Sequence, residues 1–554
     1  MAEAVADLDQ EPPVSGDRAD QARRTRLVIG ASSAGTIFEW YDFFIYGTLA
    51  ASGIIGSTFF PSGNETLQTL LAWAGFAVGF GFRPLGAILF GYMGDRLGRK
   101  TTFLVTITLM GLATAGVGLV PSAAAIGIAA PILIILLRIC QGLALGGEYG
   151  GAAIYVAEHS PPGKSGFYTS FIQASVVGGF VLSLAVVLGT KSLVSTEAWD
   201  TWWWRFPFLF SILLLAVSLW MRLKLSESPV FKALKEQGGC DANPFKASFT
   251  YPGNLKRLFV ALFGIAAGLT VIWYTAMFST LSLLQNIMRV DSTTAQIIVA
   301  LGALLGCGWY ILFGWMSDRV GRKRPIVIGY ALTLLLIFPI YWTMGNAANP
   351  DRAAAHEQAP VTIHRSGCDF DPFAARQADL CGQIIGELGR LGVQYSFSQP
   401  PAGPNVAAAA ATPVAIGLGD EVRSVAGADQ VRPLLEEAGY SFDPVIPSPG
   451  GIAVILLALL AITALSGMTY GPVAALLAEM FPPQIRYSSM SIPYHFGTGY
   501  FGGFQPFIAS YIAASTGDPY SGLWYTWVVV LMALVVSWWG LPPGPPRDFA
   551  DEIA

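Results

Sequence analysis

Long apolar runs dominate the chain, and each is close to the length that crosses a bilayer. About 20 helical residues span ~30 Å of hydrocarbon, because each residue adds ~1.5 Å of rise. Many of the runs are rich in glycine and alanine, which let helices approach closely in lipid. We therefore expect an all-α membrane protein. The twelve predicted spans lie near residues 27–51, 67–92, 101–120, 127–155, 166–190, 203–222, 258–285, 294–316, 325–345, 450–478, 488–514 and 522–540.

Composition argues against several soluble domains. Hydrophobic residues make up 53% of the 554 positions and charged residues only 12%. The negative charge is concentrated in one polar stretch, since residues 347–449 contain twelve Asp or Glu, six Arg and no Lys. Nothing in this balance indicates a nucleic-acid partner. The expected partners are the lipid bilayer, a small-molecule solute and protons, and the protein is expected to be monomeric.

The distribution of Lys and Arg predicts the orientation. One side of the spans receives 21 basic residues, whereas the other receives only Lys191, Arg205 and Arg289 outside the polar stretch. By the positive-inside rule both termini are cytoplasmic and the polar stretch is extracytoplasmic. The N-terminus does not resemble a signal peptide.

Two motifs recur along the chain. Gly-x-Met-x-Asp-Arg-x-Gly-Arg-Lys occurs at 91–100 and again at 314–323, 223 residues later. Ala-Glu-x-x-Pro-Pro occurs at 157–162 and at 478–483, which is 321 residues later. The wider second spacing indicates an insertion between the ninth and tenth spans of a duplicated protein. Duplicated halves with a site between them at mid-membrane are typical of transporters.

The chain therefore divides into two six-helix bundles and one insert. The expected parts are a tail over 1–26, an N-terminal bundle over 27–222, a central loop over 223–257, a C-terminal bundle over 258–345 plus 450–540, an insert over 346–449 and a tail over 541–554.

The insert is rich in Ala, Pro and Gly, with a short helix expected near 429–438. Cys368 and Cys381 form a disulfide or stay as two free thiols, and the sequence leaves both readings open. It also leaves open whether the insert is a lid, a docking module or an elaborated loop.

Ionisable residues inside apolar runs are costly, so each one calls for an explanation. Glu39 and Asp42 are three residues apart and share one helical face, while Arg138 lies at a matching depth in the fourth span. Such a group can act as a proton switch, in which protonation of a carboxylate frees the arginine for an anionic substrate. The alternative is a static ion pair that only fixes helix packing. Glu148, in a glycine-rich segment, has a coupling or a structural role.

The remaining candidates are polar residues of the other spans and of the repeated turns. The candidate substrate contacts are Tyr46, Gln173, Tyr274 and His495, although such residues often only join neighbouring helices. The candidate cytoplasmic gate residues are Arg83, Gly91, Asp95, Arg96, Gly98, Arg99, Glu158, Gly314, Asp318, Arg319, Gly321, Arg322 and Glu479.

The two turn aspartates favour a latch between the halves. Asp95 and Asp318 follow apolar helices, where the macrodipole disfavours negative charge. Each therefore requires a partner, and symmetry suggests helix N-termini of the opposite half, near 487–489 for Asp95 and 164–166 for Asp318. The alternative is a solvated turn that only satisfies topology.

These residues resemble those of a known family. The paired turns resemble the signature loop of the major facilitator superfamily. Segments resembling its metabolite:proton symporter branch lie at 39–47, 83–86, 138–142, 146–151 and 157–163. The resemblance implies alternating access by two rocking bundles in a bacterial inner membrane. Two features depart from the usual pattern: the insert, and Tyr-His-Phe-Gly at 494–497 in place of Tyr-Asn-x-Gly.

The function expected is proton-coupled uptake of a small organic acid, driven by the proton gradient without a cofactor or a metal. A symporter of a zwitterionic osmolyte such as proline or betaine is the first alternative. A transporter-like membrane receptor that senses through the insert is the second. An enzyme is not expected, because the sequence has no HExxH, CxxC or serine-elbow motif.

Overall fold

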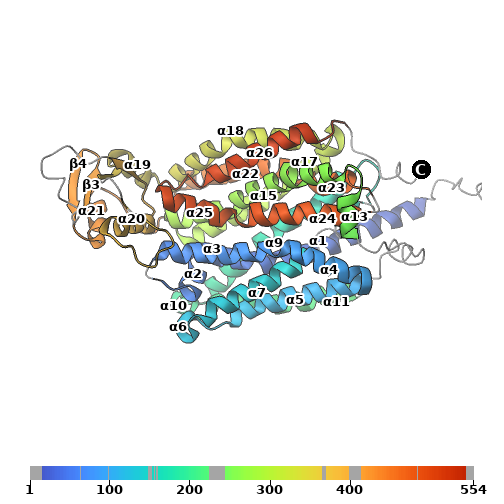
Figure 1. The fold of residues 1–554 in the computed structure, drawn as a ribbon, viewed down its shortest axis with the longest axis horizontal. Helices are drawn as coiled ribbons and strands as arrows, with labels where there is room; N and C mark the ends of the chain where they lie inside the picture. The colour runs from blue at the N-terminus through green and yellow to red at the C-terminus, as the bar shows by residue number, and fades with distance from the viewer. Residues whose placement is uncertain are drawn as a thin grey trace, which may run out of the picture.

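Helices make up most of the molecule and run roughly along one long axis (Figure 1). The computed structural model describes residues 15–62, 64–97, 99–147, 153–154, 156–157, 160–223, 244–364, 368, 370–398, 414–482 and 485–544. Side chains are described for these residues except at 15–29, 31, 32, 91, 92, 94–97, 99, 100, 103, 221–223, 244, 245 and 247.

The N-terminal half is a bundle of long helices joined by short connections. Its elements are α1 (Ser15–Ala51), α2 (Ile54–Phe59), α3 (Glu65–Gly81), α4 (Arg83–Leu97), α5 (Arg99–Leu119), α6 (Ala123–Ile126), α7 (Ala129–Gly146), α9 (Ser165–Leu193), α10 (Thr196–Thr201), the 3₁₀ turn η1 (Trp203–Arg205) and α11 (Phe206–Leu223). We call this bundle the N half.

The C-terminal half is also a helical bundle, with the insert in its middle. Its elements are α13 (Pro244–Thr250), α14 (Asn254–Phe259), η2 (Val260–Ala266), α15 (Ala267–Tyr274), η3 (Thr275–Ser279), α16 (Thr280–Ser282), η4 (Leu283–Ile287), α17 (Ser292–Val320), α18 (Lys323–Ala348), α22 (Pro449–Tyr470), α23 (Val473–Met480), α24 (Arg486–Phe496), η6 (Gly497–Gly503), α25 (Gln505–Thr516) and α26 (Leu523–Gly540). We call this bundle the C half. Segments η2, η3, η4 and η6 are π-helical turns.

Glycines allow the N half to pack backbone against backbone. A Cβ on Gly142 of α7 would lie 1.8 Å from the carbonyl oxygen of Gly79 in α3. A Cβ on Gly146 would likewise lie 2.1 Å from the carbonyl oxygen of Arg83. No side chain fits at either contact, so these glycines set the closeness of α7 to α3 and α4, as small residues do in membrane bundles.

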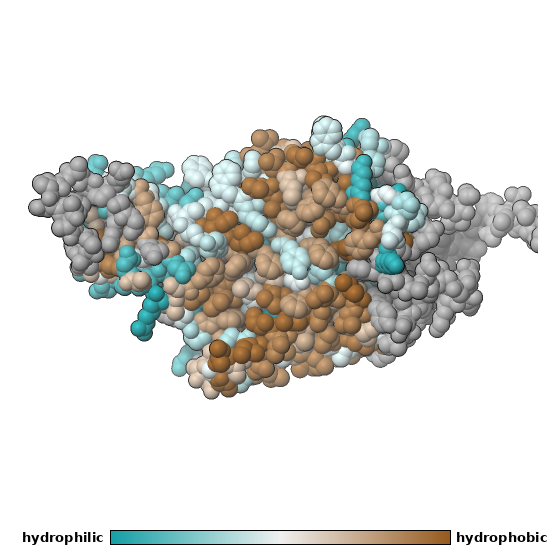
Figure 2. Space-filling view, in the orientation of Figure 1, coloured by the Kyte–Doolittle hydropathy of each residue, from teal (hydrophilic) through white to brown (hydrophobic). Residues whose placement is uncertain are grey.

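Nine helical segments of the described residues are long and apolar enough to cross a membrane. They are 65–90, 129–146, 165–193, 203–220, 254–287, 292–320, 323–348, 449–480 and 523–540. The other three predicted spans, 27–51, 101–120 and 488–514, are also helical but fall outside this measure. Figure 2 shows hydrophobic residues over the helices and hydrophilic residues toward both ends, as expected for a bundle in lipid.

The insert forms a small α/β unit at one end of the bundle (Figure 1). Its elements are α19 (Pro350–Gln358), β1 (Val361–His364), α20 (Leu380–Leu391), β2 (Tyr395–Ser398), β3 (Val414–Leu418), β4 (Glu421–Val425), the 3₁₀ turn η5 (Ala428–Gln430) and α21 (Val431–Glu437). The sheet order is β2-β1-β3-β4; β1 pairs in parallel with β2 and antiparallel with β3, which pairs antiparallel with β4. The helix expected near 429–438 is present as η5 and α21, whereas the sheet was not foreseen.

The insert has a hydrophobic core of its own, separate from that of the bundle. Ile363, Ile384, Leu388 and Ile416 lie at its centre and are almost fully buried. Cys381, at the start of α20, is bonded to Cys368 in a disulfide. We refer below to the insert end of the bundle and to the terminal end, where α1 begins and α26 ends (Figure 1).

Candidate central site

A partly open cavity of about 240 Å³, a volume that includes solvent-filled space at its mouth, lies between the two halves. Both halves contribute aromatic walls. The lining residues are Trp40, Phe44, Arg83 and Val176 from the N half, and Thr270, Trp273, Tyr274, Tyr470, Tyr494 and Thr498 from the C half. Thr498 lies in the π-helical turn η6, and Tyr274 directly precedes η3. Such turns widen a helix and often occur at functional sites.

Arg83 is the charged residue in the described lining of this cavity. It opens α4 directly after Phe82, and its side chain is fully buried. The guanidinium carbon lies 5.3 Å from the ring centroids of Trp40 and of Phe80, and 6.0 Å from that of Tyr494. Ring faces attract a cation, so these aromatic residues favour the guanidinium at this position. The structure therefore places Arg83 in the wall of the cavity, whereas the sequence grouped it with the gate residues.

Arg138 is also fully buried, but it lies inside the N half and outside the described cavity lining. Its Nε donates to the carbonyl oxygen of Gly75 at 3.3 Å, and Nη2 donates to that of Phe76 at 3.3 Å. Nη1 donates to the carbonyl oxygen of Phe43 at 3.5 Å and to Gln141 Oε1 at 2.7 Å. These bonds join α7 to α1 and α3. Arg138 thus acts as a brace within one half.

The two acids of α1 are buried, but their described contacts do not include the pair with Arg138 that the sequence suggested. Glu39 is 8% exposed and Asp42 is 6% exposed. Asp42 Oδ1 has no hydrogen-bond partner among the described residues, and no ion pair of the described residues joins either acid to Arg138. The reason is that backbone carbonyls and Gln141 surround the guanidinium. Glu39 directly precedes Trp40 of the cavity wall.

The structure separates the four proposed substrate contacts. Tyr274 lines the cavity. Tyr46 instead donates to the carbonyl oxygen of Ala72 and lies over Arg138, with its ring centroid 4.5 Å from the guanidinium carbon. Gln173 and His495 are fully buried outside the described lining, and neither ring nitrogen of His495 has a hydrogen-bond partner among the described residues. The sequence did not single out Trp40, Trp273 or Tyr470, because buried aromatic residues are common in such spans.

At the terminal end, a polar network joins the halves. Asp318 accepts hydrogen bonds from the backbone N–H groups of Gly166 and Phe167, each at 2.8 Å. This first turn of α9 is the position that symmetry suggested. Arg322 pairs with Asp318 and with Glu479, each at 2.7 Å. The network spans both halves and closes this end of the bundle.

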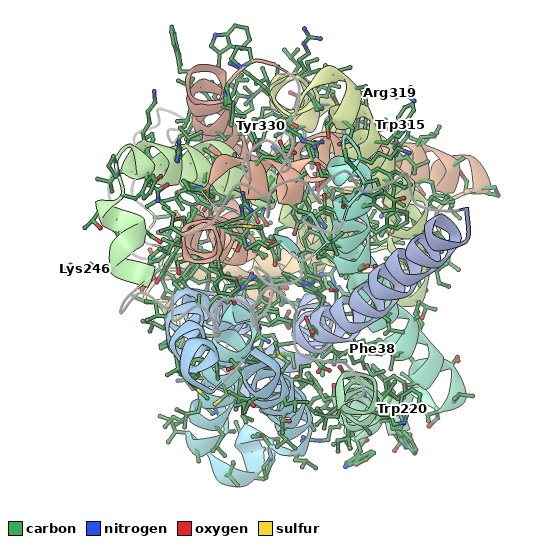
Figure 3. All side chains as sticks on the ribbon, turned by 90° about the vertical axis from the view of Figure 1, so that its right-hand side faces the viewer. Phe38, Trp220, Lys246, Trp315, Arg319 and Tyr330 are labelled. Carbon is green, nitrogen blue, oxygen red and sulfur yellow. A yellow bond between two sulfur atoms is a disulfide. The ribbon has the colours of Figure 1, made fainter. Side chains whose placement is uncertain are left out.

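Other predicted gate residues lie beside this network or outside the described residues. Gly314 packs on Gly166, whose carbonyl oxygen would lie 2.6 Å from an added Cβ. Gly321 has φ +88°, which favours glycine at the end of α17. The guanidinium carbon of Arg319 lies 3.9 Å from the centroid of the Trp315 ring, and the two residues are labelled beside each other in Figure 3. Three predicted residues lie outside the described residues: Gly98, Glu148 and Glu158. Only the backbone is described at Gly91, Asp95, Arg96 and Arg99.

The insert end is closed as well. Asn286 Nδ2 of the C half donates to the carbonyl oxygen of Ala51 in the N half at 3.2 Å. Gly47 of α1 packs directly on the ring of Phe278, since an added Cβ would lie 2.7 Å from it. Contacts between the halves therefore lie at both ends of the bundle. Among the described residues there is also no cluster of His, Cys, Asp and Glu that could hold a metal ion.

Comparison with known proteins gives a consistent result. Residues 29–350 match the family model of the Major Facilitator Superfamily. The shikimate transporter of Escherichia coli K12 is 36% identical over 330 residues, which are 58% of this chain and 73% of that protein. A proline/betaine transporter of Salmonella typhimurium is 36% identical over 329 residues, 57% of this chain and 64% of that protein. The crystal structure of a D-xylose–proton symporter superposes with a TM-score of 0.58 at 15% identity, covering 94% of this chain and 98% of that one.

Proposed function

We propose, since this chain belongs to the Major Facilitator Superfamily, that it takes up a small organic acid together with protons. The chain is a multi-pass transporter of the bacterial inner membrane and is not an enzyme. We further propose that the protein has twelve spans, cytoplasmic termini and an extracytoplasmic insert, which the charge distribution supports. Transport proceeds by alternating access, in which each end of the bundle opens in turn.

The observation that carries the substrate class is the buried guanidinium of Arg83 in a cavity whose other described lining residues are uncharged and mostly aromatic. No Asp or Glu lies in the described lining. A carboxylate that entered would meet a cation able to donate two parallel hydrogen bonds. The rings of Trp40 and Tyr494 would cover the apolar body of the solute. An anion therefore gains more binding free energy in this cavity than a neutral sugar or a cation does.

Coupling to protons is assigned to the acids of α1. Glu39 and Asp42 are buried at membrane depth, where a charged carboxylate is costly. Protonation removes that cost, so a proton taken up from outside favours the movement of α1 against the C half. Arg138 acts indirectly by holding α1 through the carbonyl oxygen of Phe43. The terminal-end network around Asp318 would break when this end opens to the cytoplasm.

An osmolyte is the second candidate substrate, and the aromatic lining favours it. Trp40, Phe44 and Tyr494 could hold a quaternary ammonium by cation–π attraction while Arg83 binds the carboxylate. The cation of a zwitterion would nevertheless lie close to a second buried cation. We therefore rank a solute with carboxylate groups alone above betaine.

Counterflow in proteoliposomes separates these candidates. Vesicles loaded with unlabelled shikimate, a dicarboxylate, proline or glycine betaine are diluted into traces of the labelled solutes, with and without an inward proton gradient. We expect exchange of an acid and accumulation of it that requires the gradient. Exchange of betaine alone would reverse the ranking. A lack of flux with every solute of a wider panel would favour the receptor reading.

A further inference from the structure

We infer that the insert is a latch over the insert end, fixed to the C half and released from the N half each time that end opens. The inference rests on the alternating access proposed above and assigns to the insert a part in it. It follows from how unequally the insert is attached to the two halves.

The attachment to the C half is extensive and includes backbone pairing. Val445, at the end of the insert, exchanges two backbone hydrogen bonds of 2.8 Å with the segment around Val290 that joins η4 to α17. Asn349 Nδ2 donates to the carbonyl oxygen of Met288 at 3.0 Å. Phe373 stacks on Tyr511 of α25, with ring centroids 5.5 Å apart. The insert and the C half are therefore expected to move as one body.

Arg289 strengthens this attachment at the C-terminus of α20, and Arg352 holds the same end of α20 within the insert. Arg289 of the C half donates to the carbonyl oxygen of Arg390 at 2.7 Å, and Arg352 of α19 donates to that of Leu391 at 2.6 Å. Terminal carbonyls of a helix lack intrahelical partners and carry partial negative charge. Arg289 is also the non-glycine residue with positive φ (55°) among the described residues. A conformation of this kind costs free energy and persists only where the surroundings hold it.

The attachment to the N half is confined, in the described residues, to the first turn of α3. Asn64 Nδ2 donates to the carbonyl oxygen of Ala374 at 2.9 Å. Arg390 lies 4.0 Å from Glu65, but both side chains are partly exposed, so this pair adds little. An added Cβ on Gly389 of α20 would lie 3.8 Å from Thr66 Oγ1. A contact this small can break and re-form in every cycle.

Rocking of the halves must therefore break the contact between α20 and α3. Opening of the insert end moves the first turn of α3 away from the C half, and the insert moves with the C half. The contact adds to the closure already made by Asn286 and Ala51. The latch thus favours the closed insert end, and its strength sets how often the cavity is open to the outside.

A disulfide across the contact tests this directly. The background is Cys140→Ala, Cys240→Ala and Cys307→Ala, which keeps the native disulfide, plus Thr498→Cys as a reporter in the cavity wall. The pair Thr66→Cys with Gly389→Cys joins α3 to α20 after oxidation. The control pair Val290→Cys with Val445→Cys joins the insert to the C half, where no movement is expected. Labelling of the reporter by a membrane-impermeant thiol reagent is measured from each side.

We expect oxidation of the Thr66–Gly389 pair to slow labelling from outside at least tenfold and to preserve labelling from the cytoplasmic side. The control pair should change neither. Equal labelling from outside in the two oxidised proteins would overturn the latch. Because labelling does not require a transported solute, a chain that labels as expected but carries nothing would overturn the proposed function alone.

A single substitution provides a second test without crosslinking. Asn64 also caps α3, since its Oδ1 accepts from the backbone N–H groups of Thr66 and Leu67. Asn64→Asp keeps an equally good cap but loses the donor to Ala374. We expect about fivefold faster labelling from outside, the effect of one net hydrogen bond. Asp379→Asn, the same exchange reversed at the cap of α20, is the matched control; equal rates in the two variants would contradict the inference.

Discussion

Arg83 and Arg138 are both fully buried in the N half, yet their surroundings differ. Arg138 is enclosed by carbonyl oxygens and by Gln141, so its hydrogen bonds are used within the protein. Arg83 lies between aromatic rings in the wall of the cavity. Under the proposed function, burial alone therefore does not identify a binding residue. What matters is whether the buried charge faces space that a solute can enter.

The largest effect is expected from Arg83. Arg83→Gln removes the charge that faces the cavity, and we expect uptake of the transported acid to fall at least about a hundredfold, since hydrogen bonds to charged groups contribute ~1.5–3 kcal/mol each. Arg83→Lys should recover only part of it, because an ammonium cannot donate in a parallel pair. Initial rates in proteoliposomes provide the measurement. If Arg83→Gln took up the acid nearly as fast as the unaltered protein, Arg83 would not be the binding residue that the comparison with Arg138 makes it.

Arg138→Met should affect the fold more than the site. It leaves Gln141 Oε1 without a donor and removes the bonds to α1 and α3, so we expect a loss of about 2–3 kcal/mol in unfolding free energy. Thermal unfolding in detergent measures this loss. The folded fraction should still bind the acid with an affinity within a few-fold of the unaltered protein. A hundredfold loss of affinity would show that Arg138 contacts the solute.

The acids of α1 should affect coupling while binding is retained. Glu39→Gln and Asp42→Asn mimic the protonated forms, so we expect accumulation against a gradient to fall about tenfold while exchange continues. Comparing gradient-driven uptake with counterflow in the same vesicles measures the difference. If both variants still accumulate the acid, neither residue carries the proton.

The smallest effect is expected one contact beyond Arg138. Gln141 Nε2 donates to Thr114 Oγ1 at 2.7 Å, and this bond orients the amide that accepts from Arg138. Thr114→Val should lower the unfolding free energy by about 1 kcal/mol and leave uptake unchanged. Denaturation midpoints of the two proteins provide the measurement. A marked loss of uptake would show that the brace and the cavity are coupled.

The apolar runs predicted helices because lipid forces backbone groups to pair within each span, and nine helices of the described residues are long and apolar enough to cross a membrane. The repeated turns also indicated where Asp318 finds its partner, because a carboxylate at the end of a helix needs one. Matching depth could not predict whether Glu39 or Asp42 pairs with Arg138, because depth says nothing of the direction in which a side chain points. Backbone carbonyls surround Arg138, and no residue pattern reveals them.

The sequence could not predict the cavity or the sheet of the insert, because both depend on contacts between distant segments. Trp40, Trp273 and Tyr494 come together only when the halves meet, and a single span carries no sign of that. The four short strands of the insert have few residues each, and their pairing joins segments far apart in the sequence. The disulfide was one of two open readings, and the structure forms it.

The most direct test is a comparison of a transported acid with its carboxamide. Equilibrium binding of both is measured on the unaltered protein, on Arg83→Gln and on Arg138→Met, as a double-mutant cycle. The account predicts that the preference for the acid disappears in Arg83→Gln and persists in Arg138→Met. An undiminished preference for the acid in Arg83→Gln would contradict it.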